Sequence, residues 1–221
     1  MRTFSRSRER GATLLVALVM LLILTVLAVS SMRGVVLESR ITGNRAESLR
    51  LQSAADAALR EAEFRFYGPG YLRDKLEPSE INCQKSNVLQ INGANRPCLL
   101  AIVDQADRLS FMLDPLGFLK NSSAENKTGA DTTAAGDTDF VTWMPYRGRE
   151  AGNDNVTETD LDAYWNTHLI TVGEDDATAL NVEYGAVMEG RGTYFYQVNG
   201  QADDRLTLQS TTANVYVGLN N

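Results

Sequence analysis

Two cysteines are the first residues in this chain whose type and spacing suggest chemistry. Cys83 and Cys98 have 14 residues between them. In an oxidising compartment they predict a disulfide, and closing a loop of this size contributes about 3 kcal/mol. Two free buried thiols are the alternative. Zinc is not expected, because two thiols and the single histidine, His168, do not supply four ligands.

Catalytic and metal-binding patterns are otherwise missing from the sequence. No cysteine lies near His168 in the sequence, and no serine has a G-x-S-x-G setting, so His168 is expected to be structural or exposed. One acidic cluster lacks the spacing of a calcium-binding loop and predicts a solvated loop instead. Its members are Asp154, Glu158, Asp160 and Asp162. We therefore expect no enzyme activity, no cofactor and no metal.

The peptide bond between Gly11 and Ala12 is the most specific chemical feature. It separates a basic leader, RSRERG, from an uncharged apolar run over residues 11–32. A small, flexible residue at this junction suits a protease that works at the cytoplasmic face of a membrane. The pattern predicts a class III signal, in which the leader 1–11 is removed and the apolar helix is retained.

The apolar run predicts a membrane-spanning helix. As a helix, its 22 residues would span roughly 33 Å, enough to cross a bilayer core. The arginines before it predict a cytoplasmic N-terminus and a periplasmic body. A plain single-pass anchor and a Sec signal peptide cut near Leu27-Ala28-Val29-Ser30 are alternatives, although the run exceeds the length usual for a signal peptide.

The helix is expected to continue well beyond the apolar run. Residues 33–66 contain no proline and are rich in Ala, Leu, Arg and Glu. Gly34 and Gly43 each weaken a helix by about 1 kcal/mol relative to alanine, and Gly68-Pro69-Gly70 ends it. One helix over about 13–66 is predicted, its transmembrane part being 12–32 and its periplasmic part 33–67. A removable signal peptide would not be continuous with such a helix.

Residues 68–221 predict a soluble domain. The runs Cys98–Val103, Thr193–Val198 and Leu206–Val217 predict strands, and a turn beginning at Asn199-Gly200 would join the last two. Residues 106–111 continue the first strand or turn. An antiparallel sheet laid against the second half of the long helix would bury the apolar sides of both, which makes an α+β, pilin-like lollipop.

A polar segment over about 121–160 predicts loop structure, with a short strand at residues 140–143. The formal charge of the chain is −7, and without residues 1–11 the remainder carries 17 basic and 27 acidic residues. This acidic balance argues against nucleic-acid binding, which requires a basic surface.

Two motifs in the predicted helix carry a family resemblance. The first, E-x-R-x-x-G-N, comprises Glu38, Arg40, Gly43 and Asn44. The second, A-A-x-A-A-L-x-x-A-E, comprises Ala54, Ala55, Ala57, Ala58, Leu59, Ala62 and Glu63. Together with the leader, they resemble the N-terminal region of PilX-type minor pilins of type IV pili. The close of the chain, with Leu208-Gln209-Ser210, resembles the final strands of that family.

The resemblance implies a role in filament assembly. A prepilin peptidase would cut after Gly11, and Ala12 would become the N-methylated N-terminus. The implied partners are other minor pilins, the major pilin, a PilY-type tip adhesin and the inner-membrane assembly platform. Such a subunit would pass from the inner membrane to the pilus, prime its assembly, and support twitching motility and adhesion.

Val16 departs from the general pilin pattern. Major pilins carry a glutamate at this position, and in the family it is thought to neutralise the N-terminal amine of the subunit above. A carboxylate within lipid is costly unless it is paired. A subunit without it is tolerable where no neighbour sits above, which favours the filament tip. The alternative is drift to an apolar residue.

Two other functions remain open from the sequence. A tip pseudopilin of type II secretion also lacks the carboxylate, although such subunits usually carry a larger inserted domain. A membrane-tethered periplasmic enzyme or binding protein would require a functional constellation in the body, and the sequence displays none.

Overall fold

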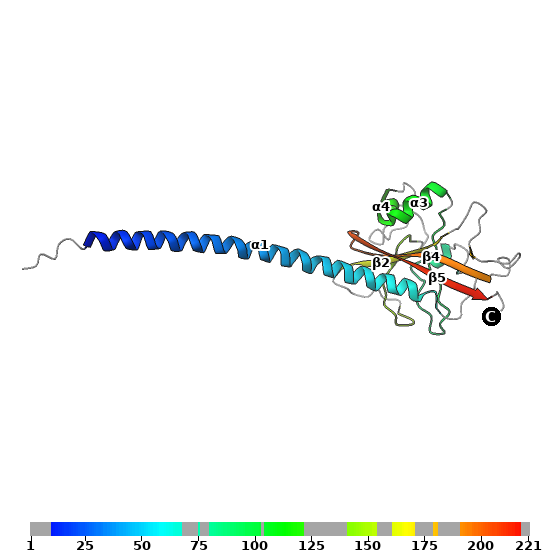
Figure 1. Cartoon of the computed structure of the whole chain (residues 1–221). Helices are drawn as coiled ribbons and strands as arrows, with labels where there is room; N and C mark the ends of the chain where they lie inside the picture. The colour runs from blue at the N-terminus through cyan, green and yellow to red at the C-terminus, as the bar shows by residue number, and fades with distance from the viewer. Residues whose placement is uncertain are drawn as a thin grey trace, which may run out of the picture. The chain divides into compact units, whose positions relative to one another are not determined.

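The computed structural model describes residues 10–67, 75, 80–102, 104–121, 141–153, 161–170, 179–180 and 191–217. The chain divides into two compact units, residues 1–48 and residues 49–221. The described part of the first unit is helical throughout, and the second contains the sheet and the shorter helices (Figure 1). The elements make an α+β fold, as the sequence predicts.

Helix α1 (Arg10–Phe64) is unbroken over 55 residues. It passes through Gly34 and Gly43, where an added Cβ would meet no atom within 4 Å. The helix ends in a turn in which the Arg65 N–H donates to the carbonyl of Glu61. The predicted helix over about 13–66 is therefore confirmed to within a few residues. The cause is the absence of proline from this whole stretch.

Five described strands form one antiparallel sheet. They are β1 (Met144–Pro145), β2 (Ala163–Ile170), β3 (Ala179–Leu180), β4 (Arg191–Ala202) and β5 (Leu206–Val217). The long strand β4 is central: β2 and β3 pair with it along one edge, and β5 pairs with its full length along the other. β1 extends the sheet beyond β2.

The turn between β4 and β5 lies later than the sequence predicts. Asn199 and Gly200 are inside β4, paired with Gln209 and Leu208 of β5. The turn is at residues 203–205, and its Asp203 and Asp204 both have φ of 52°. The prediction of a turn at Asn199-Gly200 was wrong, because the glycine there permits a close contact with α1 instead, described below.

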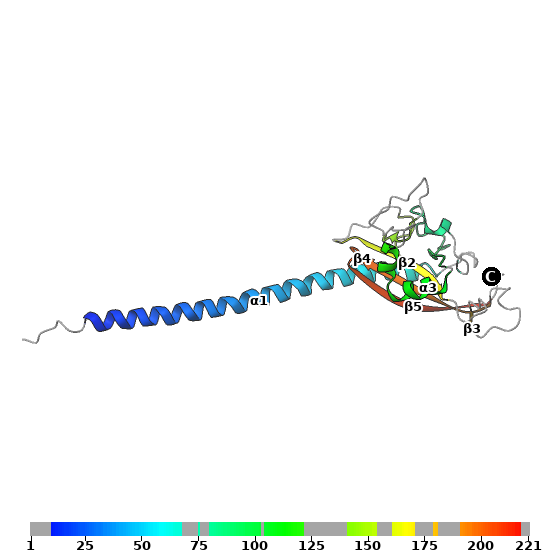
Figure 2. The same ribbon diagram turned by 90° about the horizontal axis from the view of Figure 1, so that it is seen from above.

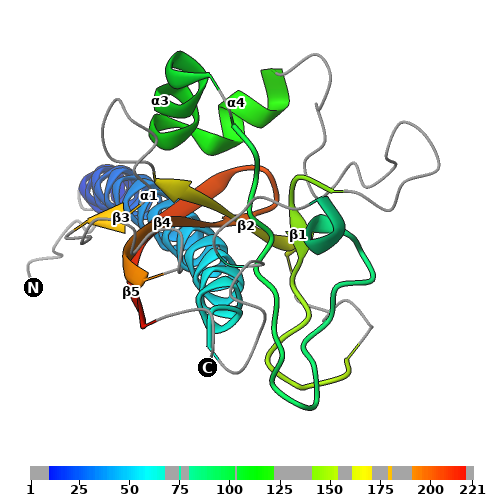
Figure 3. The ribbon, with the colours of Figure 1, turned by 90° about the vertical axis from the view of Figure 1, so that its right-hand side faces the viewer.

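The sheet lies between two helical layers. The part of α1 after Ser48 covers one face, and α3 (Gln105–Leu113) with α4 (Pro115–Asn121) covers the other (Figures 1 and 3). The second contact includes hydrogen bonds from the side-chain amides of Gln197 and Gln209 to the carbonyl of Met112. Residues 106–111, expected to extend a strand or turn, are thus part of a helix. Asp104 caps it by accepting from the N–H groups of Ala106 and Asp107.

The segment after Cys98 is extended, but it is not a strand. Its one bridge is parallel, between Leu99 and Thr167 of β2. Cys98, Leu99 and Leu100 are nonetheless buried, so the expectation of a buried segment was right and that of a strand was wrong. Similarly, the short strand expected at residues 140–143 is found just after them, as β1, and Val141 and Trp143 are buried beside it.

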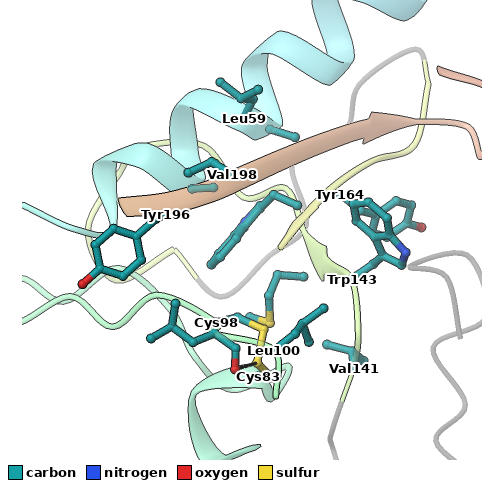
Figure 4. Close-up of a cluster of buried hydrophobic side chains, with 14 of the residues drawn as sticks. Leu59, Cys83, Cys98, Leu100, Val141, Trp143, Tyr164, Tyr196 and Val198 are labelled. Atoms are coloured by element: carbon teal, nitrogen blue, oxygen red, sulfur yellow. Dashed lines mark hydrogen bonds between the residues drawn. A yellow bond between two sulfur atoms is a disulfide. The ribbon is translucent and has the colours of Figure 1, made fainter. Parts of the chain in front are cut away.

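One main hydrophobic core fills the second unit. Figure 4 shows its composition: Leu59 of α1 and Val198 of β4 lie in the same cluster as Trp143 and the two cysteines. The aromatic residues are central to it, and Phe66 and Tyr196 have ring centroids 4.5 Å apart. The core therefore joins the end of α1, the sheet and the segments around residues 83–100 and 141–147.

Candidate cleavage and assembly segment

The predicted cleavage site lies at the beginning of α1. Gly11 and Ala12 both have helical backbone, and the side chain of Ala12 is exposed. Residues 1–9, which hold most of the predicted leader, lie outside the described residues. The cut itself and methylation of Ala12 stay predictions.

The apolar run is a fully exposed helical surface within the first unit. Every side chain from Ala12 to Ala46 is exposed, and Val16 is 56% exposed. Exposure of so many large apolar side chains is unfavourable in water and favourable in lipid. α1 is long and apolar enough to cross a membrane, and no other helix among the described residues is.

The first family motif belongs to this exposed part of α1. Glu38, Arg40 and Asn44 are exposed, and Gly43 has open space around its Cα. These side chains therefore do not form the core of the second unit, and they remain available to neighbouring molecules.

The second family motif, by contrast, builds the core. Ala55, Ala58 and Ala62 are completely buried and recur at helical spacing, so they form the face of α1 that meets β4. At the closest point, a Cβ on Gly200 would clash with the carbonyl oxygen of Ala55 and come within 2.7 Å of Leu59 Cβ. Small residues on both elements thus let the helix and the strand approach closely.

The two segments that carry the resemblance meet in space. The Ser210 hydroxyl, from the L-Q-S motif in β5, donates to Glu63 Oε1 at 2.6 Å. The two residues are 147 positions apart in the sequence. Gln209 of the same motif donates to the carbonyl of Met112 at 3.1 Å on the other face of the sheet. The L-Q-S motif therefore fastens β5 to helices on both faces.

A buried ion pair between the last turn of α1 and the residue after it was not predicted. Arg65 Nη2 lies 2.8 Å from Glu61 Oε1, and both side chains are almost completely shielded from solvent. Burial lowers the pKa of Arg65, while the Glu61 carboxylate opposes this shift. The guanidinium also lies over the ring of Trp165, 5.2 Å from its centroid. Two desolvated charges are therefore held together beside Trp165 of β2.

The carboxylate of this pair also organises a distant loop. Glu61 Oε2 accepts from the backbone N–H groups of Arg147 at 2.7 Å and Gly148 at 3.0 Å. Arg65 Nη1 reaches Asn87 Oδ1 at 3.2 Å. A sequence signal did exist, because Glu61 and Arg65 are four residues apart and continue the buried face formed by Ala58. Charged residues on an apolar face of a helix indicate a buried pair.

The two cysteines form the disulfide that their sequence predicted. Cys83 and Cys98 are bonded, with Cα atoms 4.6 Å apart, and both are buried. Cys83 ends the short helix η1 (Glu80–Cys83), and Cys98 begins the extended segment beside β2. Thr167 of β2 donates its hydroxyl to the carbonyl of Cys98 at 2.6 Å. The disulfide therefore ties η1 to the edge of the sheet.

His168 has a structural setting. It is 4% exposed, its Nδ1 is 3.2 Å from the carbonyl oxygen of Leu100, and its ring meets Phe111 edge-on. Burial lowers the pKa of His168; the hydrogen bond to Leu100 opposes this, and the charge of Arg108 adds to it. The histidine is thus neutral in the folded protein over a wider pH range than in the unfolded chain.

This lowered pKa predicts a pH effect on stability. Below about pH 6.5 the unfolded chain binds a proton at His168 that the folded chain does not, so stability should fall as the pH falls. The slope from one such group is at most about 1.4 kcal/mol per pH unit. Denaturant unfolding of the full chain in detergent between pH 7.5 and 5 measures it. Because His168 is the single histidine, His168→Gln should flatten this slope, and an unchanged slope contradicts the assignment.

The predicted acidic loop lies mostly outside the described residues. Asp162 is its one described member, and it precedes β2. Burial, followed by the charge of nearby aspartates, raises the pKa of Tyr164 to about 12. Within the described ranges, no group of three or more acidic, histidine or cysteine side chains is arranged to hold a metal ion.

Comparison with known proteins places the resemblance in α1. Residues 10–60 match the family model described as PilX N-terminal. No curated protein and no solved structure matches the chain significantly. The predicted similarity to PilX-type pilins is therefore confirmed over 51 of the 221 residues, a segment that includes both family motifs except Ala62 and Glu63.

Proposed function

We propose, from the premise that its N-terminal segment is that of a PilX-type pilin, that this chain is a minor pilin that primes type IV pilus assembly. The single observation that carries the proposal is the exposed, uncharged helix Ala12–Met32 directly behind a basic leader and Gly11, within a segment that matches the family. A structural subunit of this kind needs a long apolar helix for the membrane and then for helix packing in a filament.

The proposed path of the chain follows from this segment. A prepilin peptidase removes residues 1–11, Ala12 becomes the methylated N-terminus, and the body of residues 68–221 lies in the periplasm. α1 then packs with helices of other minor pilins and of the major pilin, through the assembly platform of the inner membrane. The subunit supports twitching motility and adhesion together with a PilY-type adhesin.

A place at the filament tip is the finer part of the proposal. Val16 offers no carboxylate to the amine of a subunit above it, so it suits a subunit that has none above. Mass spectrometry of sheared filaments measures the abundance of this chain relative to the main subunit. The chain should be present at far lower abundance than the main subunit; comparable abundance would contradict a tip position.

Gly11→Val tests the cleavage. The β-branched side chain should stop the peptidase, so the full chain should accumulate in membranes at its precursor mass and be absent from sheared filaments. Val16→Ala is the matched control, since it changes an apolar residue of the same helix and leaves the junction intact. Continued processing of the Gly11→Val protein at the same bond would overturn the leader assignment.

A further inference from the structure

Two asparagines in this chain are followed directly by glycine. They are Asn92, before Gly93, and Asn199, before Gly200. An Asn-Gly bond is chemically distinctive, because glycine has no side chain to hinder the attack of its backbone nitrogen on the amide of the asparagine side chain. The structure places the two bonds in opposite surroundings, so each serves as a reference for the other.

Asn92 lies at an exposed turn in the loop that the disulfide closes, residues 83–98. The Gly93 N–H donates to the carbonyl of Gln90 at 2.9 Å, which closes a β-turn, and Gly93 has φ of 75°. Ile91, in the same turn, is 86% exposed, and β4 and β5, which hold the other Asn-Gly bond, lie elsewhere in the second unit (Figure 2). Water and hydroxide therefore reach Asn92 directly.

The side chain of Asn92 is folded back over the peptide bond that follows it. Asn92 Oδ1 accepts from the Ala94 N–H at 3.0 Å, so the side-chain carbonyl lies across the Gly93 peptide. This hydrogen bond also polarises the carbonyl and makes Cγ more electrophilic. Among the residues that the structure describes, none holds the amide nitrogen Nδ2, which is the leaving group. The attacking nitrogen, Cγ and the leaving group are thus close together and accessible.

One contact opposes the attack on Cγ. The Gly93 nitrogen must give up the proton that it donates to Gln90, so this hydrogen bond lowers the rate. The net strength of one such bond corresponds to a factor of about ten at most. The contact therefore slows the reaction at Asn92 without preventing it.

Asn199 is protected by the fold. It is completely buried, its Nδ2 donates to Asn166 Oδ1 at 2.8 Å, and its Oδ1 accepts from Gln197 Nε2 at 3.0 Å. Asn199 and Gly200 are also extended within β4, between β2 and β5. A strand directs the side chain out of the plane of the sheet and away from the next peptide nitrogen. We therefore expect Asn199 to be unreactive while the chain is folded.

We propose that Asn92 is a modification site, at which the side-chain amide is converted through a cyclic imide to aspartate and isoaspartate. The Gly93 nitrogen loses its proton to hydroxide, and its electron pair forms a bond to Asn92 Cγ. Nδ2 takes a proton from water and leaves as ammonia. Water then opens the ring. Breaking the new N–Cγ bond gives aspartate, and breaking the bond from the same nitrogen to the backbone carbonyl carbon of Asn92 gives isoaspartate.

The products differ from asparagine in charge and in backbone length. Both add one negative charge at the exposed turn, and isoaspartate also adds one carbon atom to the backbone path. The disulfide between Cys83 and Cys98 holds the two ends of the loop together throughout. The change is therefore confined to the loop. The proposal does not depend on the function proposed above, since it requires the folded chain and water alone.

The test follows both Asn-Gly bonds in one sample. The purified full chain in detergent is incubated at pH 8.5 in water enriched in oxygen-18, and the peptides that contain Asn92 and Asn199 are measured by mass spectrometry. Gly93→Ala places a methyl group beside the attacking nitrogen. Gly152→Ala is the matched control, because Gly152 also has positive φ, 81°, and its replacement leaves the Asn92–Gly93 bond unchanged. The midpoint of thermal unfolding reports whether each variant is folded.

The expected result is conversion of Asn92 with uptake of one oxygen-18 atom, at least tenfold faster than conversion of Asn199. Unfolding the chain in denaturant should make the two rates similar. Gly93→Ala should slow conversion of Asn92 at least tenfold, and Gly152→Ala should change it less than twofold. Equal rates at Asn92 and Asn199 in the folded native chain would overturn the proposal even if Gly93→Ala failed to fold. So would conversion in folded Gly93→Ala at the native rate.

Discussion

Replacing Glu61 by alanine is expected to lower the free energy of unfolding by about 3–5 kcal/mol. The substitution leaves the guanidinium of Arg65 buried without its counter-charge, 2.8 Å from where the carboxylate was. It also leaves the N–H groups of Arg147 and Gly148 without their acceptor. Denaturant unfolding of the full chain in detergent, followed by tryptophan fluorescence, measures the change, because Trp165 lies against Arg65.

The matched control is an exposed ion pair on the same helix. Asp56 and Arg60 are also four residues apart, with 2.7 Å between Oδ2 and Nε, but their side chains are 44% and 64% exposed. Asp56→Ala should therefore cost less than about 1 kcal/mol. Replacing both Glu61 and Arg65 by methionine should cost less than Glu61→Ala alone, since no unpaired charge remains. Equal losses for Asp56→Ala and Glu61→Ala would show that burial of the pair is not the cause.

Gly200→Ala is expected to cost about 3 kcal/mol, the upper end of the range for overpacked cores. Its new Cβ would clash with the backbone carbonyl of Ala55, and a backbone atom within a helix yields less easily than a side chain. The substitution should therefore separate α1 from β4 and expose the surrounding core. A lower midpoint of thermal unfolding, with increased binding of an apolar dye, is the expected measurement.

Gly34→Ala provides the comparison for that result. Nothing lies within 4 Å of a Cβ at Gly34, and alanine is the better helix former by about 1 kcal/mol. This variant should be as stable as the native chain or slightly more so. If Gly200→Ala also left the stability unchanged, the close contact between α1 and β4 at Gly200 would be contradicted.

The long helix was predictable because its signals are local. A proline-free stretch of good helix formers directs a helix in almost any surroundings, and an uncharged run of 22 residues is enough to identify a helix that could cross a membrane. The disulfide was predictable for a similar reason, since the chain has two cysteines and one possible pairing. These features need no knowledge of tertiary contacts.

The turn at Asn199-Gly200 shows where local signals fail. Asn-Gly is the strongest short signal for a hairpin turn. Here the glycine is required by α1, and the asparagine is buried, donating to Asn166 Oδ1 at 2.8 Å. Both residues are therefore determined by tertiary contacts, with α1 and with Asn166, that their neighbours in the sequence do not indicate. The real turn uses two aspartates with positive φ, for which the local pattern is weaker.

Burial of the second half of the helix was predicted, but the buried ion pair within it was not. Glu61 and Arg65 have the spacing of an ordinary exposed pair, like Asp56 and Arg60. Their place on the same helix face as Ala58 is the one local sign of burial, and the backbone partners of Glu61 at residues 147 and 148 are 86 and 87 positions away from it. The partnership of Glu63 with Ser210 is equally non-local. Sequence analysis could identify both family motifs, but not that their ends meet.

The continuity of α1 has a mechanical consequence. One helix contains both the exposed apolar segment and the buried face at Ala55, Ala58 and Ala62. In the membrane-anchored subunit proposed above, a pull along the buried part of α1 would load that face in shear. The contacts with β4, the hydrogen bonds from Arg147 and Gly148 to Glu61 and the Ser210–Glu63 hydrogen bond resist it in parallel. Within residues 49–221 of such a subunit, this load would be borne by the packing of small residues between α1 and β4.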